Sequence, residues 1–332
     1  MTHVYSPNND TWRYGPSLPK TVSTAAVAVV EGKIWLFGGS SGYPNYVFSN
    51  TTMCYDPVKG QWSYGPDLPE PIRTAAAAVH LGKVYIIGGQ NSTWGTVQNA
   101  IIFDPTTQKF TAMEGPNSPR ARGGIAVIND TLVFAGGVNT TSDAMGMAEV
   151  YDFPPSGPTS TGLITLKSDK PSYAPEENVT LTANVQRFEW KWERIADGPN
   201  NGYLSAVGWD EQTQEMYIFG GYIGGSSGLT STWAFSPSAN KWTMKMDAPA
   251  GRYGHAAIWV PNTNCFYIFG GHDGTSTQNT LWAYYPSNDT WITKSTGPSA
   301  RNHMSLIWDP DMNAVIMYGG NQTCIPGQLR TR

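Results

Sequence analysis

The sequence predicts an all-β protein, namely a six-bladed β-propeller with four antiparallel strands in each blade. Three marks that each recur six times along the chain support this prediction. They are a Gly-Gly pair, an aromatic residue ahead of each pair, and an aromatic residue shortly before a proline. Repeats of about 50 residues that can each form a four-stranded sheet are typical of propeller blades.

The glycine pairs end short apolar runs that are rich in β-branched and aromatic residues. They are Gly38-Gly39, Gly88-Gly89, Gly136-Gly137, Gly220-Gly221, Gly270-Gly271 and Gly319-Gly320. Successive intervals are 50, 48, 84, 50 and 49 residues, so the third interval holds an insertion. Glycine suits a strand end where φ becomes positive or where two backbones approach closely.

The aromatic marks keep step with the glycine pairs. Trp12, Trp62 and Phe110 lie 26 residues before their pairs, and Trp192, Trp242 and Trp291 lie 28 residues before theirs. We expect these large rigid side chains to fill the wedge between neighbouring blades.

One repeat illustrates the four expected strands. They cover Thr74–His80, Lys83–Ile87, Ala100–Phe103 and Lys109–Ala112, and Gly, Pro, Asn and Asp bound them. The chain begins and ends in the middle of such a unit. Residues 4–14 supply only third and fourth strands, and residues 303–320 supply only first and second strands. We therefore expect the two ends to share the sixth blade, which removes free edges; the alternative is a truncated parent with a seventh blade.

The motif of a glycine pair, an aromatic residue before proline and then a tryptophan resembles the kelch-repeat propeller family. The resemblance covers nearly the whole chain, with Phe110 in place of one tryptophan. It implies that the loops after the glycine pairs share one face with the links between blades. Short hairpins such as Leu81-Gly82 and Asn288-Asp289 would lie on the other face.

Four segments follow from this repeat. Residues 1–153 and 188–321 are expected to form the propeller, residues 154–187 an insertion, and residues 322–332 a tail. The insertion combines a proline-rich linker with two predicted strands, and it resembles the first two strands of an immunoglobulin-like module. An isolated hairpin is marginally stable in water, so we expect it to pack on the propeller or on another chain.

Composition excludes several classes of protein. The net charge is −4 and charged residues make up 14%, whereas nucleic-acid-binding proteins usually carry a basic stripe. Aromatic residues make up 12%, which argues against disorder. No run approaches about 18 uninterrupted apolar residues, so we expect no membrane span.

Glycosylation sequons are unusually frequent. Asn-x-Thr occurs at Asn9, Asn50, Asn91, Asn129, Asn139, Asn178, Asn288 and Asn321, mostly in predicted loops or turns. This excess predicts an N-glycosylated extracellular protein. No basic and apolar leader follows Met1, so we interpret the chain as a fragment of a longer secreted protein. The alternative is a cytosolic protein with unused sequons.

No motif indicates catalysis. The sequence lacks a nucleophile elbow, a phosphate-binding loop and paired metal-ligand spacing. Some kelch propellers are copper-radical oxidases of galactose oxidase type, and that resemblance would make His255 and His303 candidate copper ligands. Cys54, Cys265 and Cys324 show no relation to a matching tyrosine, which such a site requires. We expect no metal, no cofactor and no catalytic residue, with the oxidase as an alternative.

Arginines gather where the first strands begin. Arg73, Arg122, Arg252 and Arg301 each precede a predicted first strand, and Arg120 lies beside them. Because first strands converge on the axis of a propeller, these side chains are expected to line the channel mouth and to bind carboxylate, sulfate or phosphate. The kelch resemblance implies an acidic peptide. The alternative is that the arginines donate to carbonyl groups of neighbouring blades.

The sequence therefore favours an extracellular, non-catalytic propeller for structure, adhesion or assembly. Its partners would be proteins or further copies of itself, reached through the loops, the inserted hairpin and the arginine-lined mouth. The alternative is a glycan- or acidic-peptide-binding module of a larger receptor or enzyme. That module would also use Trp94, Tyr43, Tyr46 and Tyr222 as contacts.

Overall fold

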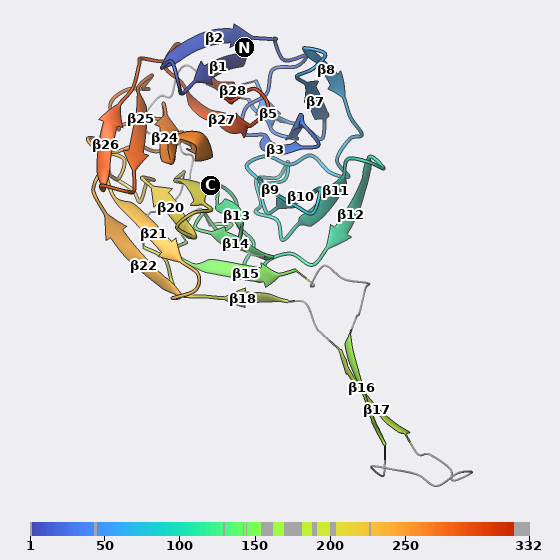
Figure 1. The fold of residues 1–332 in the computed structure, drawn as a ribbon. Coiled ribbons are helices and arrows are strands. Elements are labelled where there is room, and N and C mark those ends of the chain that lie inside the picture. Colours follow the sequence, from blue (N-terminus) through green and yellow to red (C-terminus); the bar gives the residue numbers. More distant parts are fainter. Residues whose placement is uncertain are drawn as a thin grey trace.

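The computed structural model describes residues 2–42, 45–128, 130–141, 143, 145–153, 191–199, 204–225 and 227–321, together with the backbone of 162–168 and 181–187. Six four-stranded antiparallel sheets stand in a ring around an axis (Figure 1). The predicted all-β, six-bladed propeller is confirmed.

Each blade runs outward from a first strand at the axis to a fourth strand at the rim. The first blade holds β3 (Ala26–Val30), β4 (Lys33–Phe37), β7 (Thr52–Asp56) and β8 (Gln61–Tyr64). The second holds β9 (Ala76–His80), β10 (Lys83–Ile87), β11 (Ala100–Asp104) and β12 (Lys109–Met113). The third holds β13 (Gly124–Ile128), β14 (Thr131–Ala135), β15 (Ala148–Asp152) and β18 (Trp192–Arg194).

The remaining blades repeat the order. The fourth holds β19 (Ala206–Asp210), β20 (Glu215–Phe219), β21 (Thr232–Ser236) and β22 (Lys241–Lys245). The fifth holds β23 (Ala256–Val260), β24 (Cys265–Phe269), β25 (Leu281–Tyr285) and β26 (Thr290–Thr293). The sixth holds β27 (Asn302–Asp309) and β28 (Ala314–Asn321) from one chain end, and β1 (Thr2–Ser6) and β2 (Thr11–Gly15) from the other.

The sixth blade closes the ring as the sequence predicts. Strand β1 pairs antiparallel with β28, so that Val4 lies opposite Ile316. The first strands of all six blades contact their neighbours in a closed circle. Backbone hydrogen bonds between the two ends of the chain therefore hold the ring together.

The core lies between neighbouring blades, and the repeated tryptophans fasten it. In four blades the indole N–H donates to a backbone carbonyl of the preceding blade or of the link that follows it. These bonds run from Trp62 to Pro16 (3.3 Å), from Trp192 to Glu114 (3.0 Å), from Trp242 to Ala196 (3.3 Å) and from Trp291 to Met246 (2.9 Å). The ring of Trp12 instead lies 5.2 Å from that of Phe269 in the fifth blade. The expected aromatic wedges are thus confirmed.

The glycine pairs stand where one blade meets the next. Gly38 has a φ of +65°, and a Cβ atom there would lie 2.3 Å from the carbonyl oxygen of Ile72. The neighbouring Gly39 N–H donates to the same carbonyl at 2.7 Å. Any side chain would break this contact, which explains why glycine recurs at the position.

The insertion forms a separate two-stranded sheet. Strands β16 (Gly162–Ser168) and β17 (Leu181–Arg187) pair antiparallel, with Leu166 opposite Ala183. The hairpin projects from the ring between β15 and β18, and no blade strand pairs with it (Figure 1). Both strands lie within the predicted insertion at residues 154–187. The likeness of the insertion to an immunoglobulin-like module stays a prediction. Residues 154–161, 169–180, 188–190 and the tail at 322–332 lie outside the described residues.

Two further expectations concern a membrane span and the three cysteines. In the described part of the chain, no helix is long and apolar enough to cross a membrane. Cys54 and Cys265 are buried free thiols, whereas Cys324 lies outside the described residues.

Candidate functional site at the channel mouth

One residue per blade, at the start of the first strand or just before it, forms a ring around the axis. These residues, here called the axial ring, are Thr24, Thr74, Arg122, Leu204, Gly254 and His303, and all have positive φ. Five backbone hydrogen bonds of 2.8–3.2 Å link them from blade to blade. The ring supplies a structural register that the sequence does not show.

This register separates the predicted arginines into three positions. Arg122 lies in the axial ring, and Arg73 lies one residue before it. Arg252 and Arg301 lie two residues before the ring, as does Arg120. The four arginines therefore do not occupy equivalent positions in their blades. A one-residue slip in a strand or its lead-in turns a side chain to another face, and spacing along the sequence could not detect it.

Arg73 is buried in an aromatic cage. The loop containing β5 (Ser40–Ser41) and β6 (Val47–Phe48) brings two of the rings, and the loop after β10 brings Trp94. The guanidinium carbon lies 4.5 Å from the ring centre of Tyr46, 5.5 Å from that of Phe48 and 5.0 Å from that of Trp94. Cation–π attraction of this kind holds the cation in a fixed orientation.

The charge of Arg73 is incompletely compensated. The residue is 3% exposed, and its Nε and Nη1 atoms have no hydrogen-bond partner. Among the described residues, no carboxylate forms an ion pair with it. Burial, followed by the charge of Arg122, lowers the pKa of Arg73 to about 10. At neutral pH the group is still a cation, and it lacks a counter-charge.

His303, in the axial ring, is an uncharged imidazole under the influence of both arginines. Burial, then Arg122 and Arg73, lowers the pKa of His303 to about 3, so the imidazole is uncharged at neutral pH. Its Nδ1 lies 2.9 Å from Oδ1 of Asn302. Arg122 and Arg73 thus influence the same imidazole from adjacent blades, across the axis.

A tyrosine–histidine cluster lies in the loops of the fourth and fifth blades. His272 accepts hydrogen bonds at Nδ1 from the hydroxyl of Tyr253 (3.0 Å) and the N–H of Gly274 (2.9 Å). The other ring nitrogen, Nε2, is therefore the one that carries hydrogen, and it has no partner. The ring of Tyr222 lies 4.9 Å from that of Tyr253.

The three arginines that lie two residues before the axial ring form contacts within their own blades. Arg120 pairs with the buried carboxylate of Glu149 and also donates to the Met147 carbonyl at 3.1 Å. Arg252 lies 4.3 Å from the ring centre of Trp282 and donates to the Gly251 carbonyl at 2.9 Å. The alternative from the sequence is that the arginines donate to carbonyl groups of neighbouring blades. Arg120 and Arg252 do donate to carbonyl groups, but these belong to the arginine's own blade. Sequence reasoning did not single out Glu149.

Comparison with known families now has a structural basis. A family model described as the KLHDC2/KLHL20/DRC7 Kelch-repeats domain matches residues 168–330, and the Kelch motif matches residues 22–69 and 71–117. The chain belongs to the kelch-repeat family. A solved structure of YjhT matches this kelch propeller with a TM-score of 0.65 and 16% identity, covering 86% of this chain and 88% of that one. At that identity the likeness shows the fold alone. No curated protein matches the chain.

Several sequons of this kelch propeller have an ordered local geometry. Asn9 and Asn288 are exposed in hairpin turns, and Asn50, Asn91, Asn139 and Asn321 are half-buried. The threonine hydroxyl donates to the asparagine Oδ1 at Asn91 (2.8 Å), Asn139 (2.8 Å) and Asn288 (2.7 Å). Asn129 and Asn178 lie outside the described residues.

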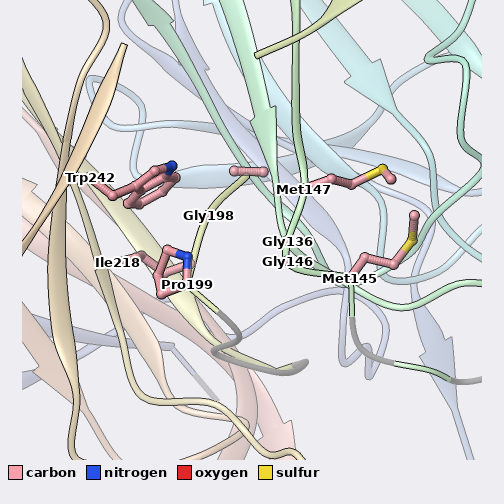
Figure 2. A pocket seen from close by; sticks show the side chains of 9 residues that line it. Gly136, Met145, Gly146, Met147, Gly198, Pro199, Ile218 and Trp242 are labelled. Carbon is pink, nitrogen blue, oxygen red and sulfur yellow. The ribbon is translucent and has the colours of Figure 1, made fainter. Parts of the chain in front are cut away.

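Three further features are the metal-ligating side chains, the buried His255 and a small cavity between two blades. The part of the chain that the structure describes has no group of three or more His, Cys, Asp or Glu side chains that could hold a metal. Both ring nitrogens of His255 are buried without a partner, against Phe219. A cavity lined by Met145, Ile218 and Trp242 between the third and fourth blades has a volume of about 10 Å³, which leaves room for at most one water molecule (Figure 2).

Proposed function

We propose that this kelch propeller is a non-catalytic binding module whose channel mouth takes an acidic segment of a partner protein. The observation that carries the proposal is Arg73, a buried cation with two nitrogens that lack an acceptor. A carboxylate would supply both the missing counter-charge and the missing acceptors. The proposal assigns no catalytic residue and no cofactor.

The surroundings of Arg73 support a protein ligand. An arginine guanidinium binds a carboxylate through two parallel hydrogen bonds, which adds directional specificity. The aromatic cage restricts the guanidinium, so little side-chain entropy remains to be lost on binding. Trp94 is 47% exposed beside it and offers apolar area to residues that flank the acidic group. Aromatic and arginine side chains are the groups enriched in protein interfaces.

Substitution of the two mouth arginines tests this function. We expect Arg73→Gln and Arg122→Gln each to weaken binding of a fluorescent oligo-glutamate peptide at least about tenfold. A hydrogen bond to a charged group contributes about 1.5–3 kcal/mol, and about 1.4 kcal/mol corresponds to a factor of ten. Fluorescence anisotropy measures the affinity, with an oligo-glutamine peptide as the neutral probe.

Arg252→Gln is the matched control, because Arg252 is also buried but lies two residues before the axial ring, beside Trp282. If it weakens oligo-glutamate binding as much as the mouth variants do, the assignment to the mouth is wrong. Binding of neutral glycans that Arg73→Gln leaves unchanged would instead favour a glycan-binding module.

We also propose that the propeller is an extracellular N-glycoprotein that acts in structure or adhesion. The threonine–asparagine bond at Asn91 and Asn288 engages the amide oxygen and leaves the amide nitrogen, the glycan acceptor, outside that bond. Asn288 is exposed in the hairpin turn between β25 and β26, far along the blade from the glycine pair. A glycan there would leave the channel mouth open.

Expression of the chain behind a secretion signal in a eukaryotic host should add glycan mass at Asn288 and Asn91. Peptide mass spectrometry before and after enzymatic deglycosylation measures occupancy at each sequon. Asn288→Gln should remove one glycan and leave the others in place. Unmodified peptides at both sites would contradict the extracellular assignment.

A further inference from the structure

Three arginines at equivalent positions face three different partners. Arg120, Arg252 and Arg301 all lie two residues before the axial ring. In each of these blades the arginine faces the second residue of the third strand. That residue pairs with the second-strand residue that lies two positions before the glycine pair. Register pairs Glu149 with Phe134, Trp282 with Ile268 and His3 with Met317. The same fold position therefore holds a carboxylate, an indole and an imidazole.

The partners of Arg120 and Arg252 stabilise the cation, but that of Arg301 does not. Arg120 pairs with Glu149, and Arg252 lies 4.3 Å from the ring centre of Trp282. Burial, followed by the charge of Arg301, lowers the pKa of His3 to about 4. His3 is therefore neutral at pH 7 and supplies no counter-charge.

Hydrogen bonds satisfy only part of the Arg301 guanidinium. Its Nε donates to the Ser299 carbonyl (3.1 Å), Nη1 to the Gly319 carbonyl (3.2 Å) and Nη2 to the Ser299 hydroxyl (2.8 Å). A guanidinium has five N–H groups, so one on Nη1 and one on Nη2 have no acceptor among the described residues. Arg301 is 4% exposed and forms no ion pair with any described carboxylate. Burying an unpaired cation is unfavourable.

Arg301 is one of the residues that line an open pocket. The pocket lies where the link from β2 to β3 crosses the glycine pair of the sixth blade, and its volume is about 200 Å³. The lining residues are Ser17, Leu18, Thr21, Val22, Arg301, Gly319 and Gly320. Two hydroxyl groups accompany the arginine, the remaining side chains are apolar, and none of the lining residues is acidic.

We propose that this pocket binds a single carboxylate group on a short apolar stem. The carboxylate would accept the two free N–H groups of Arg301 and a hydroxyl of Ser17 or Thr21, while the stem would contact Leu18 and Val22. The volume is below the roughly 300–1,000 Å³ of pockets for drug-sized ligands. It therefore suits one side chain or one small acid. This site is separate from the channel mouth and does not depend on the function proposed for Arg73.

The test titrates propionate into the ¹⁵N-labelled chain and follows the Arg301 Nε–Hε resonance by NMR, with propionamide as the neutral control. We expect saturable shifts with a dissociation constant of about 1 mM or tighter, and none with propionamide. N-acetyl-glutamic acid amide forms the second arm. Tighter binding of this compound assigns an acidic side chain of a protein as the ligand, and tighter binding of propionate assigns a free acid.

His3→Glu is the decisive variant, because it copies the Glu149 arrangement into the sixth blade. An internal carboxylate would pair with Arg301, so propionate affinity should fall at least tenfold while the melting temperature stays equal or rises. Arg301→Lys, in which the backbone amide resonances of Gly319 and Gly320 report binding, should weaken binding similarly, because lysine cannot form two parallel hydrogen bonds to a carboxylate. The matched control Arg252→Lys, and the mouth variant Arg73→Gln, should leave binding unchanged. Shifts that do not saturate, or full affinity in His3→Glu, would overturn the proposal.

Discussion

Replacement of Glu149 by alanine is expected to lower the free energy of unfolding by about 3–5 kcal/mol. Arg120 is 0% exposed and Glu149 is 2% exposed, so the variant would leave a fully buried guanidinium without its counter-charge. The hydrogen bonds of Arg120 to the carbonyls of Ser118 and Met147 would remain, but they do not neutralise it. Urea denaturation followed by tryptophan fluorescence measures the change in midpoint at constant slope.

Two variants show that the loss arises from the unpaired charge. The double replacement Arg120→Met with Glu149→Leu should recover most of the stability, because an apolar pair of similar volume can replace a buried ion pair. Asp197→Ala should change stability by less than about 1 kcal/mol, because the Arg194–Asp197 pair is exposed. An effect of Glu149→Ala as small as that of Asp197→Ala would refute the argument.

Acidification is expected to destabilise the propeller steeply between pH 6.5 and about pH 4. Burial lowers the pKa of His3 to about 4 and those of His255 and His303 to about 3, with nearby arginines adding to the shift. In the unfolded chain these groups titrate near 6.5. Across that window the unfolded state binds protons that the folded state excludes, so stability present above pH 6.5 is lost as the pH falls.

The expected slope follows from proton linkage. Each such histidine contributes at most about 1.4 kcal/mol per pH unit, and three contribute about 4 kcal/mol per pH unit. Denaturation at successive pH values measures it. His255→Phe keeps a flat ring against Phe219 and removes two buried nitrogens that lack partners. The variant should be at least as stable as the original chain at pH 7. Its unfolding free energy should depend on pH less steeply, by the contribution of one histidine, about 1.4 kcal/mol per pH unit. An unchanged pH dependence would exclude His255 as a source of the effect.

Some of the site could be found from the sequence. Arg73, Arg122, Trp94 and Tyr46 are all among the predicted contacts, and the structure brings Arg73 against both aromatic rings, with Arg122 nearby. Tyr43 lies outside the described residues. Glu149 could have been found only by comparing the second residue of the third strand among the blades, which is acidic here and Trp, Met, Ile or His in the others.

The sequence by itself determined the number of blades, their four strands and the shared sixth blade. These features repeat at intervals of about 50 residues, and a repeated pattern of glycine and aromatic residues can be read without knowing any contact. Only the tertiary structure decided what each arginine does. Whether Arg120, Arg252 and Arg301 meet a carboxylate, an indole or a neutral imidazole depends on residues about 29 positions downstream or at the opposite end of the chain. Blade closure brings these groups together, and the low-dielectric interior makes the difference between them energetically large.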